Sequence, residues 1–186
     1  IDWIGDVVDG VVDVIGDVVS WFIDIPDIPD IDAQARGALI NKESNIAALP
    51  VIYGQRRIGG TRVFVETSGT DNKYLYMVLA LCEGEIELIA DIQINDVSLI
   101  GSKYAPYVQT QGFIGTDTQA ASSLMLEAPS WSSSDRLLGV AYLAVRLEFN
   151  QDVFTSIPNI TCLVKGRKVF DPRDSTTEWS SNPALC

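Results

Sequence analysis

The sequence contains no histidine, and only three of its 186 residues are cysteine. Without histidine the chain cannot form a Ser-His or Cys-His catalytic pair, a histidine metal site or an imidazole pH switch. The cysteines, Cys82, Cys162 and Cys186, lack the spacing of a metal site, and their odd number gives no complete disulfide framework. We therefore expect free, mostly buried thiols, which suits assembly in a reducing cytoplasm.

Basic residues are also scarce, because 13 Lys and Arg face 25 Asp and Glu. The formal charge of −12 and the pI near 4.2 would repel nucleic acids and anionic membranes at long range. We therefore expect basic or neutral protein partners and no direct binding to nucleic acid. A chain of this length with 47% apolar residues can form one sizeable core with an appended arm.

Residues 1–23 differ from the rest of the chain in composition. Apolar side chains fill one half of a helical wheel and aspartates fill most of the other, which predicts an amphipathic helical arm. Steps of four and three, as in a coiled-coil seam, separate Ile4, Val8, Val11, Ile15, Val18 and Phe22. Valine, aspartate and glycine are mediocre or poor helix formers, so we expect this helix to depend on a partner surface.

Several alternatives exist for this arm. A signal peptide would begin with basic residues, and a membrane span would not carry five aspartates. A helix lying on a membrane surface would place Lys and Arg on its polar face, and the arm has none. We therefore do not expect membrane contact for this segment. The arm is predicted either to dock on another protein or on its own copies, or to fold back on its own domain.

Residues 24–45 are predicted to form a linker rich in Pro and Asp. Pro26 and Pro29 prevent the helix from continuing and favour an extended path. The aspartates at 24, 27, 30 and 32 lack the glycine and the closing glutamate of a calcium loop. We interpret them as a solvated acidic linker and predict no metal site.

Residues 46–186 have the pattern of a β domain, so the predicted fold class is mainly β (α+β), an antiparallel β domain preceded by the amphipathic helix. We expect a strand at Val51–Tyr53, a basic turn between Gly54 and the Gly59-Gly60 pair, and an alternating strand over 61–66 with Val63 and Val65 on one face, so that a hairpin or bulge is the simplest outcome. The segment 116–134 is predicted to be an insertion that contacts neighbours or a mobile exposed loop, with a short strand at 124–126.

Three later segments have clearer strand patterns. Tyr74–Cys82 is apolar at nearly every position, which is typical of a strand covered on both faces. Between Glu85 and Asn95 the even-numbered positions 86–94 are apolar and should share one face, with Ile89 as the exception, before a turn at Asn95-Asp96. The strand within 136–150 is predicted to pair with Tyr74–Cys82, and a further strand or hairpin over 160–170 should break at Gly166.

Three blocks of sequence resemble a known family. The first reads PVIYGQRRIGGTRVFVET, followed by NKYLYMVLALCEGEIE and INDVSL; the second reads RLLGVAYLAVRLEFNQDVF; the third reads PNITCLVKGRKVFDPR and ends in WSSNPALC. In this order they are similar to the N-terminal hub region of the tail-tip attachment (host-specificity, central hub) proteins of lambda-like siphophages and prophages. The resemblance spans roughly residues 47–186 and implies a structural virion protein.

The resemblance also carries expectations about assembly. It implies a homotrimeric hub that closes the distal end of the tail tube and carries receptor-binding fibre domains farther along the polypeptide, which we expect to continue beyond Cys186. Expected partners are other tail-tip and tail-tube proteins and the tape-measure protein, with the host receptor contacted only by the distal domains. The expected location is the virion, after assembly in the bacterial cytoplasm.

Two other function classes stay open, and catalysis is not predicted. A receptor- or carbohydrate-binding β module would need exposed aromatic side chains in one concavity, for which the candidates are Trp131, Trp179, Tyr104 and Tyr107. A membrane-active entry factor would act through residues 1–22. The acidic pairs among Glu83, Glu85 and Glu87 are interpreted as solvated strand surface, and we predict no catalytic, cofactor or metal residues.

The predicted sites are therefore surfaces of subunit contact. On the arm they are the apolar seam residues, and in the β domain they are arginines that would meet acidic neighbours. The complete set is Val8, Val11, Ile15, Val18, Phe22, Arg56, Arg57 and Arg62.

Overall fold

The computed structural model describes residues 41–43, 48–182 and 184–185. The predicted arm, residues 1–23, and its contact residues lie outside this part, as does most of the linker predicted over 24–45. In the described ranges the secondary structure consists of β-strands and three short 3-10 helices, at Thr70–Asn72, Ala105–Tyr107 and Met125–Glu127. No helix of the described residues is long and apolar enough to span a membrane.

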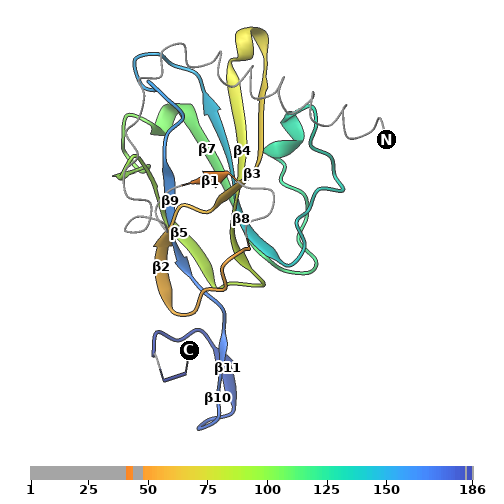
Figure 1. Cartoon of the computed structure of the whole chain (residues 1–186), viewed down its shortest axis with the longest axis vertical. Coiled ribbons are helices and arrows are strands. Elements are labelled where there is room, and N and C mark those ends of the chain that lie inside the picture. The colour runs from red at the N-terminus through yellow and green to blue at the C-terminus, as the bar shows by residue number, and fades with distance from the viewer. Residues whose placement is uncertain (1–40, 44–47, 183, 186) are drawn as a thin grey trace.

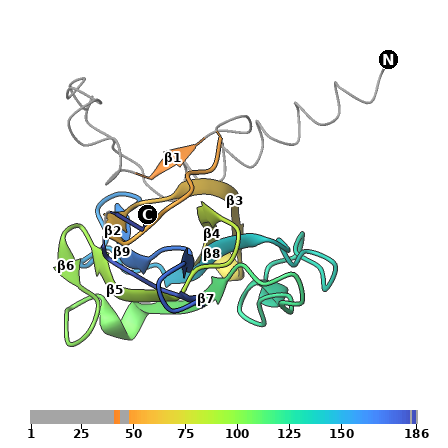
Figure 2. The same cartoon turned by 90° about the horizontal axis from the view of Figure 1, so that it is seen from below.

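The strands form two facing sheets and one small hairpin (Figures 1 and 2). The first sheet has the order β1-β3-β4-β8-β7, with bounds Lys42–Glu43, Thr61–Ser68, Tyr74–Glu83, Val140–Glu148 and Val108–Ile114. The second sheet has the order β2-β9-β5-β6, with bounds Gln55–Ile58, Ile160–Lys165, Leu88–Ile94 and Val97–Ser98. The hairpin pairs β10 (Val169–Asp171) with β11 (Thr176–Glu178). Apart from the parallel β1–β3 contact, the strand pairs are antiparallel, so the expected mainly antiparallel β fold is confirmed for the described part of the chain.

The main core fills the space between the two sheets. The odd-numbered residues of β4, 75–81, face it together with Leu143, Val145 and Leu147 of β8. From the second sheet Ile94, Ile160, Cys162 and Val164 complete it. Each fully buried aliphatic side chain contributes about 1.5–3 kcal/mol relative to exposure, so this core is the main source of stability in the sandwich. The predicted pairing of the 136–150 strand with the 74–82 strand is confirmed as β8 against β4.

A second, smaller core lies on the outer face of the first sheet. Tyr76, Val78 and Tyr142 point outward there and are buried by residues 116–139, which we call the covering segment. Its buried members are Leu124, Met125 and Ala128, and Figure 2 shows the segment beyond β8 and β4, away from β5 and β6. The first sheet is thus covered on both faces, which confirms the interpretation of the apolar run in β4.

The covering segment is closed at its two ends by Gln119, which is buried. Its Oε1 accepts a hydrogen bond from Gly115 N at 3.0 Å, and its Nε2 donates to the carbonyl oxygens of Arg136 (2.9 Å), Leu137 (2.6 Å) and Val140 (3.1 Å). The strand predicted at 124–126 is wrong, because a 3-10 turn stands there and brings Leu124, Met125 and Ala128 into the same small core. Met125–Glu127 forms that 3-10 turn.

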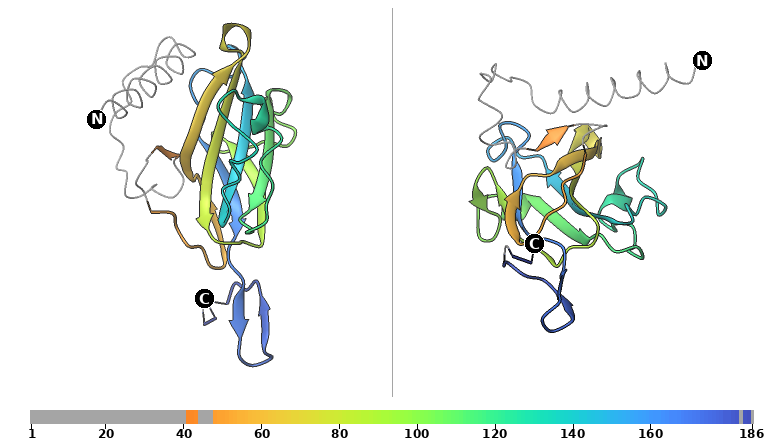
Figure 3. Two further views of the ribbon diagram at one scale, coloured as in Figure 1. Left: turned by 90° about the vertical axis from the view of Figure 1, so that its right-hand side faces the viewer. Right: turned by 60° about the horizontal axis from the view of Figure 1, so that its bottom comes forward.

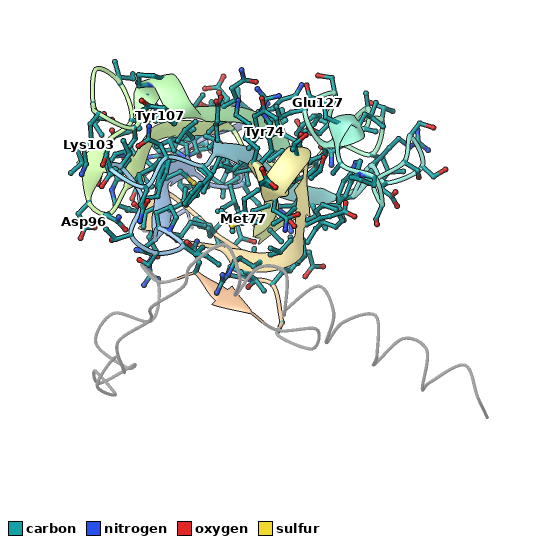
Figure 4. All side chains as sticks on the ribbon, turned by 90° about the horizontal axis from the view of Figure 1, so that it is seen from above. Tyr74, Met77, Asp96, Lys103, Tyr107 and Glu127 are labelled. Atoms are coloured by element: carbon teal, nitrogen blue, oxygen red, sulfur yellow. The ribbon has the colours of Figure 1, made fainter. Side chains whose placement is uncertain are left out.

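Charged and aromatic contacts tie the middle of the covering segment to the sheet. Glu127 forms an ion pair with Arg146, whose guanidinium lies 5.0 Å from the ring centre of Tyr74, near Glu127 in Figure 4. Trp131 packs edge-on against Phe64 with ring centres 4.9 Å apart. The segment therefore packs on its own sheet, in place of the mobile loop that was one of the two expectations.

The structure corrects the predictions around Gly54. Val51–Tyr53 is not a strand, and the residues expected to form a basic turn are β2, which pairs with β9. Positive φ at Gly54 (65°) and Gly60 (74°) bends the chain on both sides of β2. β2 belongs to the second sheet, whereas β3 pairs with β4 in the first sheet. The chain therefore crosses from one sheet to the other between β2 and β3. A Cβ at Gly60 would lie 2.8 Å from the carbonyl oxygen of Ala80, so this crossing favours glycine.

The predicted alternation in 85–95 is also wrong in part. Leu88 is exposed, and Ile89, the expected exception, packs against the main core. The pairing of β5 with β9 shifts between Ala90 and Gln93, where Asp91 has φ of 41°. This irregularity lets Ile92 contact the core too. The predicted turn at Asn95-Asp96 is confirmed by its φ values of 49° and 65° and by the hairpin it closes.

A second irregularity changes the face assignment in β3. The register shifts between Arg62 and Phe64, so Val63 is exposed while Val65 packs on the main core. Of the two outcomes expected for this stretch, a hairpin or a bulge, the structure has the bulge, at Val63. The shared face predicted for Val63 and Val65 is wrong because the bulge inserts one residue.

Asn41 fixes the point at which the described chain enters the sandwich. Its side-chain oxygen accepts a hydrogen bond from Ile160 N at 2.7 Å, and its Nδ2 donates to Ile160 O at 2.9 Å and to Gly59 O. Its backbone N–H donates to Asn159 Oδ1 at 3.1 Å. The Asn41 side chain thus joins the first residue of β9 to the connection between the two sheets.

Candidate functional site

The end of the sandwich that carries the β10–β11 hairpin combines several features of a contact surface. After β9 the chain leaves the second sheet at Gly166 and forms the hairpin, which projects away from both sheets (Figures 1 and 3). A Cβ at Gly166 would lie 2.0 Å from the carbonyl oxygen of Ile52, so only glycine fits. This explains physically the predicted break at Gly166, which the structure confirms.

Both legs of the hairpin are attached to the residues before β2. On the first leg, Gly166 N donates to Gly54 O and Arg167 N donates to Ile52 O, each at 2.8 Å. On the second leg, the indole Nε1 of Trp179 donates to the same Gly54 oxygen at 3.0 Å. Lys165 Nζ lies 4.5 Å from the centre of the Trp179 ring, a cation–π contact. The base of the hairpin is therefore fixed to the sandwich.

The hairpin itself is small. Three residue pairs join its strands, and no third strand pairs with them among the described residues. The guanidinium of Arg173 hydrogen-bonds both carboxylate oxygens of Asp171, and these bonds lower the pKa of Asp171 to about 2. Asp174 Oδ1 accepts from Thr176 N at 3.0 Å and closes the turn. Local polar contacts thus define the tip, whereas the strand edges are open in the described structure.

Exposed large apolar side chains gather at this end. Phe170 on β10 is 58% exposed, and Tyr53 and Val51 before β2 are 49% and 44% exposed. Three more such residues lie on neighbouring segments of the same end: Leu88, Ile114 and Leu138. Backbone hydrogen bonds join these segments, from Ile86 N to Ile114 O and from Gly84 N to Gly139 O. Exposed apolar groups with a polar surround are typical of protein contact surfaces.

Two of the three predicted arginine sites lie near this end, both on β2. Arg56 is exposed and forms no ion pair with the described carboxylates, whereas Arg57 is paired with Asp91. Arg167 lies exposed beside Ile52 and likewise has no carboxylate partner in the described part. Arg62 lies on β3 of the first sheet and is half-buried. The five apolar sites, Val8, Val11, Ile15, Val18 and Phe22, lie outside the described residues and stay predictions.

The structure separates the aromatic residues that a carbohydrate site would require. Trp131 packs on Phe64 at the outer face of the first sheet. Tyr104 is buried and stacks on Phe154 with ring centres 5.6 Å apart, and Tyr107 packs on the main core. Trp179 lies under Lys165 at the hairpin end. These four aromatic side chains therefore do not converge on one concavity.

The cysteines of the described structure are buried and free, as predicted for Cys82 and Cys162. Burial raises the pKa of Cys82 and raises that of Cys162 to about 12, so both thiols are protonated at neutral pH. Cys186 lies outside the described residues. Within the described ranges no three His, Cys, Asp or Glu side chains group as metal ligands.

The hairpin end was only partly predictable from the sequence. The arginines of β2 were visible as a basic cluster, whereas Val51, Tyr53 and Phe170 look like ordinary strand residues. A usable signal is the pair Gly54 and Gly166, because glycine at the end of a strand pattern can mark a close approach of two backbones.

The fold is a two-sheet β-sandwich with a projecting hairpin, and comparison with known proteins finds one distant sequence relative and one structural likeness. No protein-family model matches the chain. The sequence is 24% identical, over an alignment of 192 residues, to baseplate hub protein pb3 of Escherichia phage T5, covering 70% of this chain and 20% of pb3. The chain is thus a distant homologue of a phage baseplate hub protein and spans about one fifth of its length.

A weaker likeness exists to a solved structure. A chain in the virion of a native gene transfer agent particle superposes with a TM-score of 0.49 and 17% sequence identity. The superposition covers 77% of this chain and 30% of that chain.

Proposed function

We propose that this protein is a structural component of a phage tail and forms part of the hub at its distal end. In this role three copies surround the tail axis, close the tube and connect it to receptor-binding fibre domains. The observation that carries the proposal is the distant homology to the baseplate hub protein pb3. The resemblance of residues 47–186 to the lambda-like tail-tip family supports the finer assignment.

The proposal divides the chain into three parts. Residues 1–23 form the helical arm, 24–45 the linker and 46–186 the hub domain. Nine of the 25 acidic residues precede residue 36, whereas all 13 Lys and Arg residues follow residue 35. Thirteen basic against 16 acidic residues give the remainder a formal charge of only −3. Copies of the domain can therefore approach one another at a modest electrostatic cost.

Partners and location follow from the same role. The neighbours are other tail-tip and tail-tube proteins and the tape-measure protein, and assembly takes place in the bacterial cytoplasm before the hub becomes part of the virion. The proposal assigns no catalytic step, cofactor or metal to this chain.

Labelling of purified particles tests the location. A gold-conjugated antibody against the β domain should mark the distal end of the tail in electron micrographs, and native mass spectrometry of the full-length protein should give a trimer. Label on the capsid, or a protein that stays monomeric at every concentration, would contradict the proposal.

The apolar seam of the arm is a proposed subunit contact with its own test. The double change Val11→Asp and Ile15→Asp should block incorporation into tails, because two carboxylates would enter an apolar interface. The matched control is Asp9→Asn with Asp13→Asn on the polar face, which should assemble normally. Circular dichroism should show the β domain folded in both variants. Infectious particles of ordinary yield from the seam variant would refute this role.

A further inference from the structure

Among the described residues, no third strand pairs with the β10–β11 hairpin beyond its attached base. Two-stranded hairpins are marginally stable in water unless a third strand or a packing surface joins them. Here three residue pairs are present, and Phe170 between them is 58% exposed. Exposed strand edges of this kind also readily pair with another chain. The hairpin is therefore suited to a partner.

We propose that the hairpin of one copy binds a docking surface on a second copy, formed by Val51, Tyr53, Arg56 and Arg167. This inference rests on the proposed function, because it presupposes that the chain assembles with its own copies. Beyond the hub role, the inference names the two surfaces that meet and states that acidic groups on one surface meet basic groups on the other.

The hairpin contributes an apolar group beside an acidic edge. Phe170 and Thr177 are paired and share one face. The hairpin residues 169–178 contain three carboxylates and one arginine, and Arg173 is already paired with Asp171. The exposed carboxylates of Asp174 and Glu178 give this element a net negative charge.

The docking surface has the opposite character. Val51 and Tyr53 are about half exposed and offer apolar side chains on which a Phe ring can pack. Arg56 follows them on β2, and Arg167 is hydrogen-bonded to Ile52 between them through its backbone N–H. Both guanidinium groups are exposed without a carboxylate partner in the described ranges. Phe170 would therefore meet Val51 and Tyr53, while Glu178 would face arginine.

The hairpin leaves its own copy beside the docking surface. Its base is fixed by Gly166 and Trp179 to Gly54, and from there it extends away from the sandwich (Figure 3). The projecting part is thus free to meet the docking surface of a second copy, and the proposal places the contact there. Because it joins two different surfaces, it is heterologous, and it closes a ring of three when each copy is turned by one third of a full rotation relative to the next. A trimer made in this way leaves no hairpin without a partner.

Charge exchange between the two faces tests the inference. Glu178→Arg and Arg56→Glu, each alone, should weaken self-association of the full-length protein by about tenfold, and the two changes together should restore most of it. Lys103→Glu makes the same charge change in the loop before β7 and should have no effect. Sedimentation equilibrium measures the association, and thermal unfolding verifies that each variant is folded.

Disulfide trapping gives an independent readout. In a Cys186→Ser background, copies with Thr177→Cys mixed with copies with Tyr53→Cys should form a disulfide between chains under mild oxidation, since the native Cys82 and Cys162 are buried. Replacing Tyr53→Cys by Lys103→Cys should abolish it. If the trimer forms but neither charge exchange nor trapping occurs, the hairpin contact is wrong and the hub role stands. If the unaltered protein is monomeric, both fall.

Discussion

The two sheets of the sandwich differ in how many of their faces are covered. The first sheet is buried between the main core and the covering segment, so β4 is buried from Leu75 to Cys82 without interruption. The second sheet is buried on its inner face, while its outer face carries Leu88, Arg57 and Lys165 at exposed or half-exposed positions. The covered sheet is a rigid scaffold, and the open sheet, with the hairpin that follows it, has surface to offer a partner.

Truncation of one leucine in each sheet should give the largest difference in the free energy of unfolding. Leu143→Ala in β8 removes a side chain buried in the main core and should lower the free energy of unfolding by about 2–5 kcal/mol. Leu88→Ala on the open face should change it by less than about 0.5 kcal/mol. Urea unfolding of the purified protein measures both. Equal losses would mean that the outer face of the second sheet is covered as well.

Removal of the Gln119 side chain should loosen the covering segment and expose the outer face of the first sheet, as the outer face of the second sheet is exposed. Gln119→Ala leaves the carbonyl oxygens and the Gly115 N–H at the ends of the covering segment without their partner, which should cost about 1–3 kcal/mol. Gln109→Ala at an exposed position of β7 is the control. Faster proteolysis within 116–139 is expected for Gln119→Ala alone, and an unchanged cleavage pattern would show that the core contacts suffice.

The inner face of the second sheet can be probed through Cys162. Its folded pKa of about 12 lies above the value of about 8.5 for a free thiol, so the folded state holds the proton more tightly. The corresponding stability is complete below the unfolded pKa and is lost as the pH rises toward 12, by at most about 1.4 kcal/mol per pH unit. Between pH 8 and pH 10.5, the free energy of unfolding should fall less in Cys162→Ala than in the unaltered protein. Rapid reaction of this thiol with Ellman's reagent in the native protein would contradict its burial.

The smallest effect is expected at the hairpin tip. Asp171 has its pKa lowered to about 2 by hydrogen bonds from Arg173, so its contribution is present above the ordinary carboxyl pKa and disappears as the pH falls through 2. Arg173 is exposed and the hairpin tip projects from the sandwich, so we expect little change in global stability from Arg173→Gln. Carboxyl NMR should show the pKa of Asp171 returning to its ordinary range. A large global destabilisation would instead mean that the hairpin supports the sandwich.

The sequence predicts the two central strands of the covered sheet better than the other strands. Strands β4 and β8 could be recognised and paired because a strand buried on both faces is apolar throughout. The faces of β3 and β5 could not, because the bulges at Val63 and Asp91 depend on the partner strands and leave no local signal. Val51–Tyr53 was wrongly predicted as a strand because its apolar pattern is local. The pattern does not show that the chain bends at Gly54 and Gly60 to pass from one sheet to the other.

The candidate surface shows the same division. Arg56 and Arg57 were predicted as contact residues from their charge, and the structure finds one exposed and the other paired with Asp91. Phe170, Tyr53 and Val51 were not predicted as contact residues, because exposure of an apolar residue in a strand pattern depends on what the rest of the fold covers.

The Asn41 contacts have a mechanical consequence. Asn41 holds the beginning of β9 at Ile160, and the hairpin leaves the other end of the same strand after Lys165. Tension between the preceding segment and the hairpin would run lengthwise through β9, which is hydrogen-bonded on both sides by β2 and β5. Under a force along β9, those hydrogen bonds would have to break together in shear and not one after another. The strand would therefore transmit the force through the domain and resist being pulled out.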